Sequence, residues 1–382
     1  MTFLLFLVDF RSSLHARASS TVLQLSAWEP YQVFDSSYSV YGLRANLLHG
    51  NNEFLYGIDL GVANEIQRGS HGIQFGLVNL NRGYSFTLST ALYEFTAESQ
   101  YGISVPLIAR TKGNVNGLQI GLLYNTGKLF KWPQLGGWNE SSASPLQIGW
   151  IANYSEHSVD LGQVSTVSNE TLEHAPFQIS SGWNQATRAG IQLAGLVNLA
   201  EDTSIQFGGL LNGARLGADL QIAGFSNVLK QPAYDPERPD SVEVPLAQIS
   251  AFYNEAEQSH MQFGFFNRQR DFAWTQIGVV NVAGRGFFQA GLINVSDSGV
   301  LFKFALVNAD RGGGPTIRFG VLNTGTGNRG IQVGIFNANL GHKGISIGLI
   351  NAAIRLDGIQ IGLLNVNGSG PIPLMPGINF GD

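Results

Sequence analysis

The sequence contains no cysteine, few charged residues and no long apolar run. The absence of cysteine from 382 residues excludes a disulfide framework and any thiolate metal site. Charged residues make up 13% of the chain, the formal net charge is −5, and no basic run is long enough to hold nucleic acid. No apolar segment reaches the roughly 20 residues that a membrane-spanning helix needs. An integral membrane protein with this sequence would therefore have to be a closed β-barrel.

Glycine is abundant, with 48 residues, and it marks a repeat. The segments Gly330–Asn337, Gly344–Asn351 and Gly358–Asn365 read GIQVGIFN, GISIGLIN and GIQIGLLN, and they start 14 residues apart. Within one unit Ile331 and Val333 point to one side, and Gln332 points to the other. This period of two is typical of a β-strand, not of a helix. The sequence therefore predicts an all-β repeat protein built from short strands.

The position of Gln332 in the unit, here called the Gln position, recurs along the chain. It is always polar or charged, and its neighbours on both sides are apolar, apart from Thr275. One face of each strand is thus apolar, and the other is polar or small. The 22 residues assigned to the Gln position are Gln24, Arg44, Asp59, Gln74, Thr87, Ser104, Gln119, Gln147, Asp160, Gln178, Gln192, Gln206, Gln221, Gln248, Gln262, Gln276, Gln289, Lys303, Arg318, Gln332, Ser346 and Gln360.

The spacing of these positions favours an antiparallel architecture. Of the 21 intervals, 16 span 13 to 15 residues, and the longer ones are the first, fifth, seventh, ninth and thirteenth. In an up-and-down sheet, odd-numbered connections share one rim, and outer-membrane barrels have short turns at one end and longer loops at the other. We therefore predict an antiparallel up-and-down β-barrel of about 22 short strands. Segments 126–144 and 228–244 are its predicted outer loops.

The alternative fold is a β-solenoid of 14-residue coils, with Ile and Leu inside, Gln outside and the Asn residues stacked in a ladder. It explains the fixed period. It also explains the short apolar band, because seven tilted residues span only about 16 Å, whereas a membrane strand needs about 9 to 11 residues. It does not explain why the long intervals are all odd.

The chain divides into three segments. Residues 1–20 are a candidate signal peptide, with an apolar stretch at 3–8 and a small-x-small site at 16–18, although no basic residue precedes the stretch. A misassigned start codon and an N-terminal strand are the alternatives. Residues 21–370 form a single repeat domain, and the Pro-rich segment 371–382 is a C-terminal tail or an edge strand.

The repeat units resemble those of a known family. Residues 72–79 (GIQFGLVN) and 358–365 (GIQIGLLN), the segment 40–50 followed by 57–61, and the ending Pro373–Phe380 are similar to the leptospiral-type surface-repeat proteins of bacteria. The resemblance covers about residues 22 to 380. It implies an exported protein of the cell envelope, and it transfers no activity to particular residues.

No arrangement of residues predicts catalysis, a cofactor or a metal. The seven histidines lack metal-ligand spacing, and the GxGxxG match at 325–330 precedes a strand instead of the helix that a nucleotide site needs. We therefore expect a protein that is not an enzyme and has no cofactor and no metal. The expected partners are membrane lipid on the apolar face and small solutes in the lumen, with no nucleic acid.

Charged residues at mid-strand Gln positions are the candidate functional residues. Such charges would line a water-filled lumen and set its ion preference. We therefore predict a passive pore or surface-exposed protein of the bacterial outer membrane or cell surface. A solenoid surface protein acting as a scaffold or interaction module is the alternative. The predicted lumen-facing residues are Arg44, Asp59, Asp160, Lys303, Arg318, Gln332 and Gln360.

Overall fold

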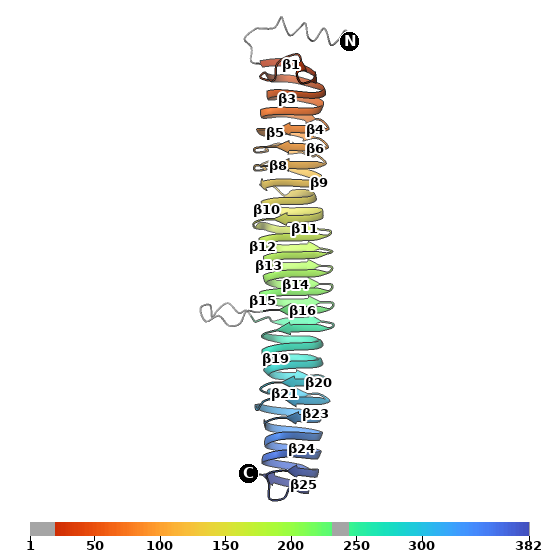
Figure 1. Ribbon diagram of the computed structural model, residues 1–382, viewed down its shortest axis with the longest axis vertical. Coiled ribbons are helices and arrows are strands. Elements are labelled where there is room, and N and C mark those ends of the chain that lie inside the picture. Colours follow the sequence, from red (N-terminus) through yellow and green to blue (C-terminus); the bar gives the residue numbers. More distant parts are fainter. Residues whose placement is uncertain (1–19, 231–243, 382) are drawn as a thin grey trace, which may run out of the picture. The chain divides into compact units, whose positions relative to one another are not determined.

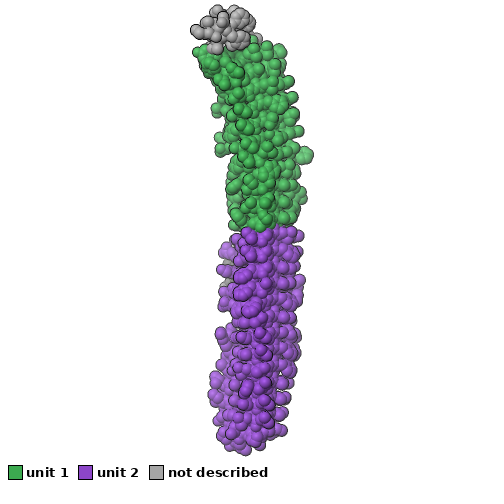
Figure 2. Space-filling view, turned by 90° about the vertical axis from the view of Figure 1, so that its right-hand side faces the viewer, with its two compact units in different colours: residues 1–189 green, residues 190–382 purple. Residues whose placement is uncertain are grey.

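The computed structural model describes residues 20–230 and 244–381, which fold into two β-solenoid units (Figure 1). The units are residues 1–189 and 190–382 (Figure 2). Both are made of strands and turns, which confirms the prediction of an all-β repeat protein. The described residues contain no helix that is long and apolar enough to cross a membrane.

The strands differ widely in length, because some of them continue through the bends of several coils. Unit 1 contains β1 (Ser20–Trp28), β2 (Tyr31–Gln32), β3 (Ser39–Phe75), β4 (Val78–Asn81), β5 (Tyr84–Thr90), β6 (Tyr93–Thr96), β7 (Ile103–Ser104), β8 (Ile108–Thr111), β9 (Leu118–Leu129), β10 (Gln134–Ser155), β11 (Val159–Ser165) and β12 (Ser168–Ser180), and the division between the units falls within β13 (Trp183–Ala194). Unit 2 contains β14 (Val197–Gly208), β15 (Leu211–Ala223), β16 (Ser226–Leu229), β17 (Ala247–Ser250), β18 (Tyr253–Ala256), β19 (Ser259–Ala290), β20 (Ile293–Ser296), β21 (Val300–Phe304), β22 (Val307–Asp310), β23 (Pro315–Gly325), β24 (Asn328–Asn367) and β25 (Leu374–Gly381).

One coil consists of two strand segments joined by two bends. In the coil formed by β21 and β22, the first segment carries Lys303 at the Gln position, and the second carries Asn308 five residues later. β21 pairs in parallel with β19 and β23, and β22 pairs in parallel with β20 and β23. Each coil therefore adds one strand to each of two parallel sheets. Ile, Val and Phe at alternate positions suit such strands.

Glycine allows successive coils to approach closely at the start of the first segment. Gly330 and Gly344 have positive φ values of 127° and 130°. A Cβ atom on Gly344 would lie 2.2 Å from the carbonyl oxygen of Gly330 in the preceding coil. A larger residue would both strain this backbone and clash with its neighbour.

The predicted antiparallel barrel is wrong. Corresponding residues of successive coils pair in parallel, as Arg318 does with Gln332 and Asn323 with Asn337. The described antiparallel pairings are those of β1 with β2 and of β24 with β25, near the two ends of the described chain. A 14-residue repeat suits both folds, and only the strand direction separates them. The structure instead agrees with the β-solenoid alternative.

Two of the five long intervals result from misplaced residues. Gln74 pairs with Ser89 and Ser89 with Ser104, so Thr87 does not occupy the Gln position. Gln163 pairs with both Gln147 and Gln178, so Asp160 does not occupy it either. The long intervals attributed to Thr87 and Asp160 therefore do not exist.

A third long interval conceals a whole coil. Leu135 pairs with Ile120, which makes Gln134 the unrecognised Gln position of the coil after Gln119. The predicted outer loop 126–144 is therefore largely strand, within β9 and β10. Of the other predicted loop, 228–244, residues 231–243 lie outside the described residues.

The interior of the coils is largely polar, with small buried apolar clusters such as Val40, Leu55 and Ile66. Gln332 and Asn337 are each 1% exposed, whereas Ile331 and Ile335 are 38% and 41% exposed. The solenoid alternative was therefore right about the coil and the stacked asparagines but wrong about the facing, since it placed Ile and Leu inside. The Gln side chains do point inward, but they fill the coil and do not line the lumen that the barrel prediction required.

The last strand closes unit 2. β25 runs antiparallel to the end of β24, with Ile361 opposite Ile378, and it contains Pro376. It therefore covers the hydrogen-bonding edge of the last coil, which would otherwise remain open.

Candidate interaction surface

The glutamines form a hydrogen-bonded ladder inside unit 2. The Nε2 of Gln206 donates to Oε1 of Gln192 at 2.8 Å, and Gln221 donates to Gln206 at the same distance. The second Nε2 hydrogen of Gln206 reaches the carbonyl oxygen of Gly213, on the other strand of the coil. The interior is thus about one side chain thick. The ladder continues through Gln248, Gln262, Gln276 and Gln289.

The asparagines form a second ladder, which runs unbroken through twelve coils of unit 2. Each Nδ2 donates to Oδ1 of the next asparagine at 2.8–3.3 Å. Most also donate to a backbone carbonyl, as Asn281 does to Ala290. A buried amide is costly only when it is unpaired, so paired ladders make a polar interior stable. The members are Asn198, Asn212, Asn227, Asn254, Asn267, Asn281, Asn294, Asn308, Asn323, Asn337, Asn351 and Asn365.

Two of the predicted lumen residues form a buried ion pair in unit 1. Arg44 Nε donates to Asp59 Oδ1 at 2.8 Å, and its terminal nitrogen donates to Oδ2 at 2.5 Å. Both side chains are fully buried. Their neighbour Gln74 donates to the same carboxylate. The charges neutralise each other within the packed coil and line no channel.

Two further predicted residues share one carboxylate in unit 2. Lys303 Nζ lies 2.5 Å from Asp310 Oδ1, and Arg318 lies 3.1 Å from Oδ2, with all three side chains buried. Burial lowers the pKa of Lys303 to about 8 and that of Arg318 to about 10. Arg318 also donates to Gln332. The sequence analysis did not predict Asp310 as part of this site. It lies seven residues after Lys303, which is the same spacing as between Gln206 and its hydrogen-bond acceptor Gly213.

The two remaining predicted residues, Gln360 and Asp160, lie on opposite sides of the coil wall. Gln360 is buried and donates to the carbonyl of Val366, in the manner of the other ladder residues. Asp160 is exposed on the outside of its coil.

Sequence reasoning also missed two buried titratable groups. Glu94 replaces an asparagine of the unit 1 ladder, and the Ser89 hydroxyl lies 2.8 Å from both of its carboxylate oxygens. Burial raises the pKa of Glu94 to about 6. In unit 2, burial, followed by the charge of Arg318, lowers the pKa of His342 to about 4. The signal for Glu94 was its place 15 residues after Asn79.

The outside of unit 2 is apolar over one sheet and one bend. From the residue before the Gln position to the asparagine, its twelve coils contain only two charged residues, Lys303 and Arg318, and both are buried. The residue at the following bend is large, apolar and half-exposed in most coils. This corner column consists of Leu196, Leu210, Phe225, Phe252, Phe265, Leu292, Leu306, Val321, Ile335, Leu349 and Leu363.

Aromatic stacking makes this surface continuous between coils. Phe304 and Phe319, each 41% exposed, stack with ring centroids 5.1 Å apart. In the corner column Phe252 stacks on Phe225 at 5.0 Å and on Phe265 at 5.6 Å. The first-strand columns, which are the residues on either side of the Gln position, and the corner column together are called the apolar surface below.

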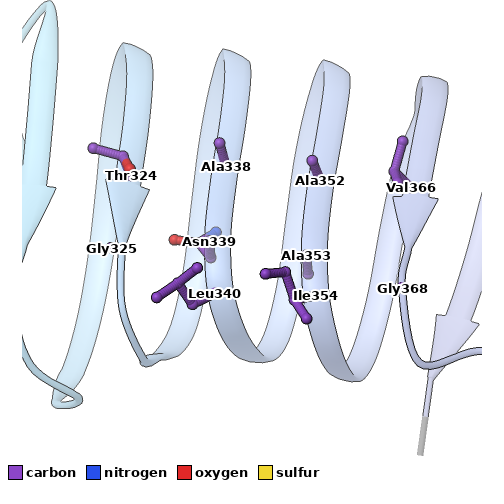
Figure 3. A pocket seen from close by; sticks show the side chains of 10 residues that line it. All are labelled: Thr324, Gly325, Ala338, Asn339, Leu340, Ala352, Ala353, Ile354, Val366 and Gly368. Carbon is purple, nitrogen blue, oxygen red and sulfur yellow. The ribbon is translucent and has the colours of Figure 1, made fainter.

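The second sheet extends this character in the last coils. Leu340 and Ile354 lie in one row, and the small residues Ala338 and Ala352 lie in another (Figure 3). A groove of about 340 Å³ lies along them. It is lined by Thr324, Gly325, Ala338, Asn339, Leu340, Ala352, Ala353, Ile354, Val366 and Gly368.

Exposed charges gather where the second strand of a coil returns to the first, a line called the charged edge below. Pairs join successive coils there, including Arg311 with Asp297 at 3.5 Å and Lys343 with Asp357 at 2.7 Å. Such exposed pairs contribute little to stability. Similar pairs are Arg215–Glu201, Arg270–Glu257 and Arg285–Asp271.

Unit 1 has the same plan with a more mixed exterior. Leu25, Leu60 and Ile148 follow the Gln position and are exposed. A polar groove of about 340 Å³ crosses its second sheet, lined by charged residues that include Arg110, Lys128 and Glu140.

Comparison with family models, with curated proteins and with solved structures finds no match for this chain. Among the described residues, no three His, Asp or Glu side chains gather in a way that could hold a metal ion.

Proposed function

We propose that this protein is a non-enzymatic β-solenoid scaffold of the bacterial outer membrane or cell surface, and that it binds its partner through its apolar exterior. The observation that carries the proposal is the reversed polarity of the coil, in which amide ladders fill the interior and Ile, Leu and Phe face outward. Monomeric soluble proteins seldom expose apolar patches larger than about 300–600 Å².

The predicted pore is not part of this proposal. A solenoid coil is filled by its own side chains. Of the charges predicted to line a lumen, Arg44 pairs with Asp59, and Lys303 and Arg318 both pair with Asp310, while Asp160 lies on the outside of its coil. We keep the sequence-based prediction of an exported surface protein, which the resemblance of the repeat units supports. The apolar exterior supplies the reason for such a protein to associate with another component of the envelope.

Fractionation of cells that express the full chain tests the proposal. The wild type is expected in the envelope fraction, and the double variant Leu306→Glu/Leu349→Glu is expected to move to the soluble fraction. Both side chains are half-exposed, so the variant should still fold, which circular dichroism checks.

A charge change at the charged edge is the matched control. Lys343→Glu introduces the same residue at a site that is already solvated, and it should remain with the wild type. An envelope association that survives the double variant would overturn the proposal.

A further inference from the structure

We infer that the partner of the apolar surface of unit 2 is the interfacial layer of a lipid bilayer, in which the unit lies with its charged edge toward water. This inference rests on the proposed function and names the occupant of that surface. Its basis is the separation of charge around each coil, together with the size and curvature of the uncharged part.

The extent of the surface fits a bilayer or a large interface. Twelve coils at about 4.8 Å per strand give a length of about 58 Å. The seven or eight residues from the one before the Gln position to the asparagine span about 23–26 Å, so the surface covers about 1,300–1,500 Å². This is well above the largest apolar patch of an ordinary monomer, at about 600 Å².

The curvature favours lipid over a second copy of the chain. The apolar surface covers the outside of the first sheet and the corner column, and exposed apolar residues such as Phe336 and Leu364 follow it on the second sheet. Two flat sheets packed face to face would bury only one of these sides. A fluid layer can surround all of them at once.

The charges are placed as a bilayer interface requires. Exposed ion pairs such as Arg311–Asp297 and Lys343–Asp357 stand on the charged edge, away from the apolar surface. The two signs are balanced in these pairs, so attachment would come from apolar burial rather than from attraction to anionic lipid.

An aromatic residue marks the boundary between the two zones. Trp274 is 49% exposed and lies two residues before the Gln position of its coil. It is in edge contact with Phe272, which lies under Arg285 of the charged edge. Tryptophan prefers the level of the lipid headgroups, between the acyl chains and water.

The chain has no cysteine, so single cysteine variants of the full-length protein can each carry one environment-sensitive fluorophore. Leu306→Cys places the label on the corner column, and Arg311→Cys places it on the charged edge of the same coil. The labelled proteins are mixed with protein-free phosphatidylcholine vesicles, with and without brominated acyl chains, at low and high salt.

The label at position 306 is expected to shift to the blue and to be quenched by brominated lipid, while the label at 311 stays unchanged. High salt should leave binding intact. The variant Leu306→Glu/Leu349→Glu measures the contribution of the corner column to affinity, and it should weaken vesicle binding by about tenfold or more.

Equal responses at positions 306 and 311, or an absence of vesicle binding, would overturn the inference. A third outcome separates the two proposals: the protein fails to bind vesicles but still fractionates with the envelope, and Leu306→Glu/Leu349→Glu abolishes that fractionation. This result would support the proposed function and indicate a protein partner in place of lipid. A dimer that forms without lipid and buries the label at 306 would assign the surface to a second copy instead.

Discussion

The two units use the same interior ladders, but only unit 2 keeps its asparagine ladder intact. In unit 1 the ladder runs from Asn46 to Asn79 and is then interrupted by Glu94 and Ala109. The buried charges differ as well, since Arg44 has one carboxylate to itself whereas Lys303 and Arg318 share one. One backbone plan thus tolerates two different internal charge arrangements, in each of which the buried cations contact a buried carboxylate.

The largest expected effect is at the shared carboxylate. Asp310→Asn leaves Lys303 and Arg318 as two buried cations without an anion, and it should lower the free energy of unfolding by about 3–5 kcal/mol. Urea unfolding measures the loss. The exposed Asp297→Asn is the control, with a change of about 0.5 kcal/mol or less. A loss no greater than that of Asp59→Asn in unit 1 would contradict the contrast between the clusters.

His342 should make unit 2 sensitive to acid. Its pKa falls from 6.5 in the unfolded chain to about 4 in the folded one, so the unfolded state binds the extra proton between these values. Stability that is present above pH 6.5 is therefore lost as the pH falls toward 4, by about 3 kcal/mol. His342→Leu, which copies the buried Leu356 of the next coil, should remove this slope in urea unfolding. An unchanged slope in this variant would assign the acid sensitivity to another group.

Removal of one ladder rung should cost less. Asn281→Ala deprives Asn267 of its acceptor and Asn294 of its donor, and it should lower the free energy of unfolding by about 2–3 kcal/mol. Hydrogen exchange should rise in the coils on both sides of the gap. A change confined to residue 281 would show that the rungs are independent of one another.

Glu94 should give unit 1 the opposite response to acid. Its pKa rises from 4.5 to about 6 on folding, so the folded state binds the extra proton. Stability is therefore gained as the pH falls from 6 to 4.5 and lost as it rises again, by about 2 kcal/mol. Glu94→Gln should remove this loss at pH 7, and the same change at the exposed Glu98 is the control. A greater stability of wild type than of Glu94→Gln at pH 7 would contradict it.

The smallest effect on stability is expected outside. Leu306→Glu lies in the half-exposed corner column and should change the free energy of unfolding by about 0.5 kcal/mol or less. Urea unfolding without lipid checks this. A loss comparable to that of Asn281→Ala would mean that the corner column is part of the core and not a free surface.

The sequence predicted the strands and the inward Gln side chains, but it could not choose the strand direction. Alternation at Ile331, Gln332 and Val333 is the same in a barrel and in a solenoid. The prediction of antiparallel strands depended on the lengths of the intervals between Gln positions. Two of these lengths were wrong, because Ser89 and Gln163 occupy the Gln positions that were assigned to Thr87 and Asp160. Irregular coils leave the local pattern ambiguous, and only pairing between distant residues resolves it.

The sequence predicted only part of the buried charged cluster of Lys303, Asp310 and Arg318 in unit 2. Lys303 and Arg318 stood out as charges at the Gln position, but Asp310 belongs to the other strand of the coil. Its role follows from the thin interior, which brings residues seven apart into contact. The solenoid alternative placed the wrong side chains inside for a related reason. It assumed an apolar interior and did not consider that stacked amide side chains can hydrogen-bond to one another.

The reversed last strand has a consequence for aggregation. Parallel stacks of identical amides are the arrangement from which amyloid fibrils grow, each new chain templating on the end of the one before. β25 ends unit 2 with a strand of opposite direction that contains a proline. An incoming coil therefore finds no matching template at this end, and elongation by further copies stops there.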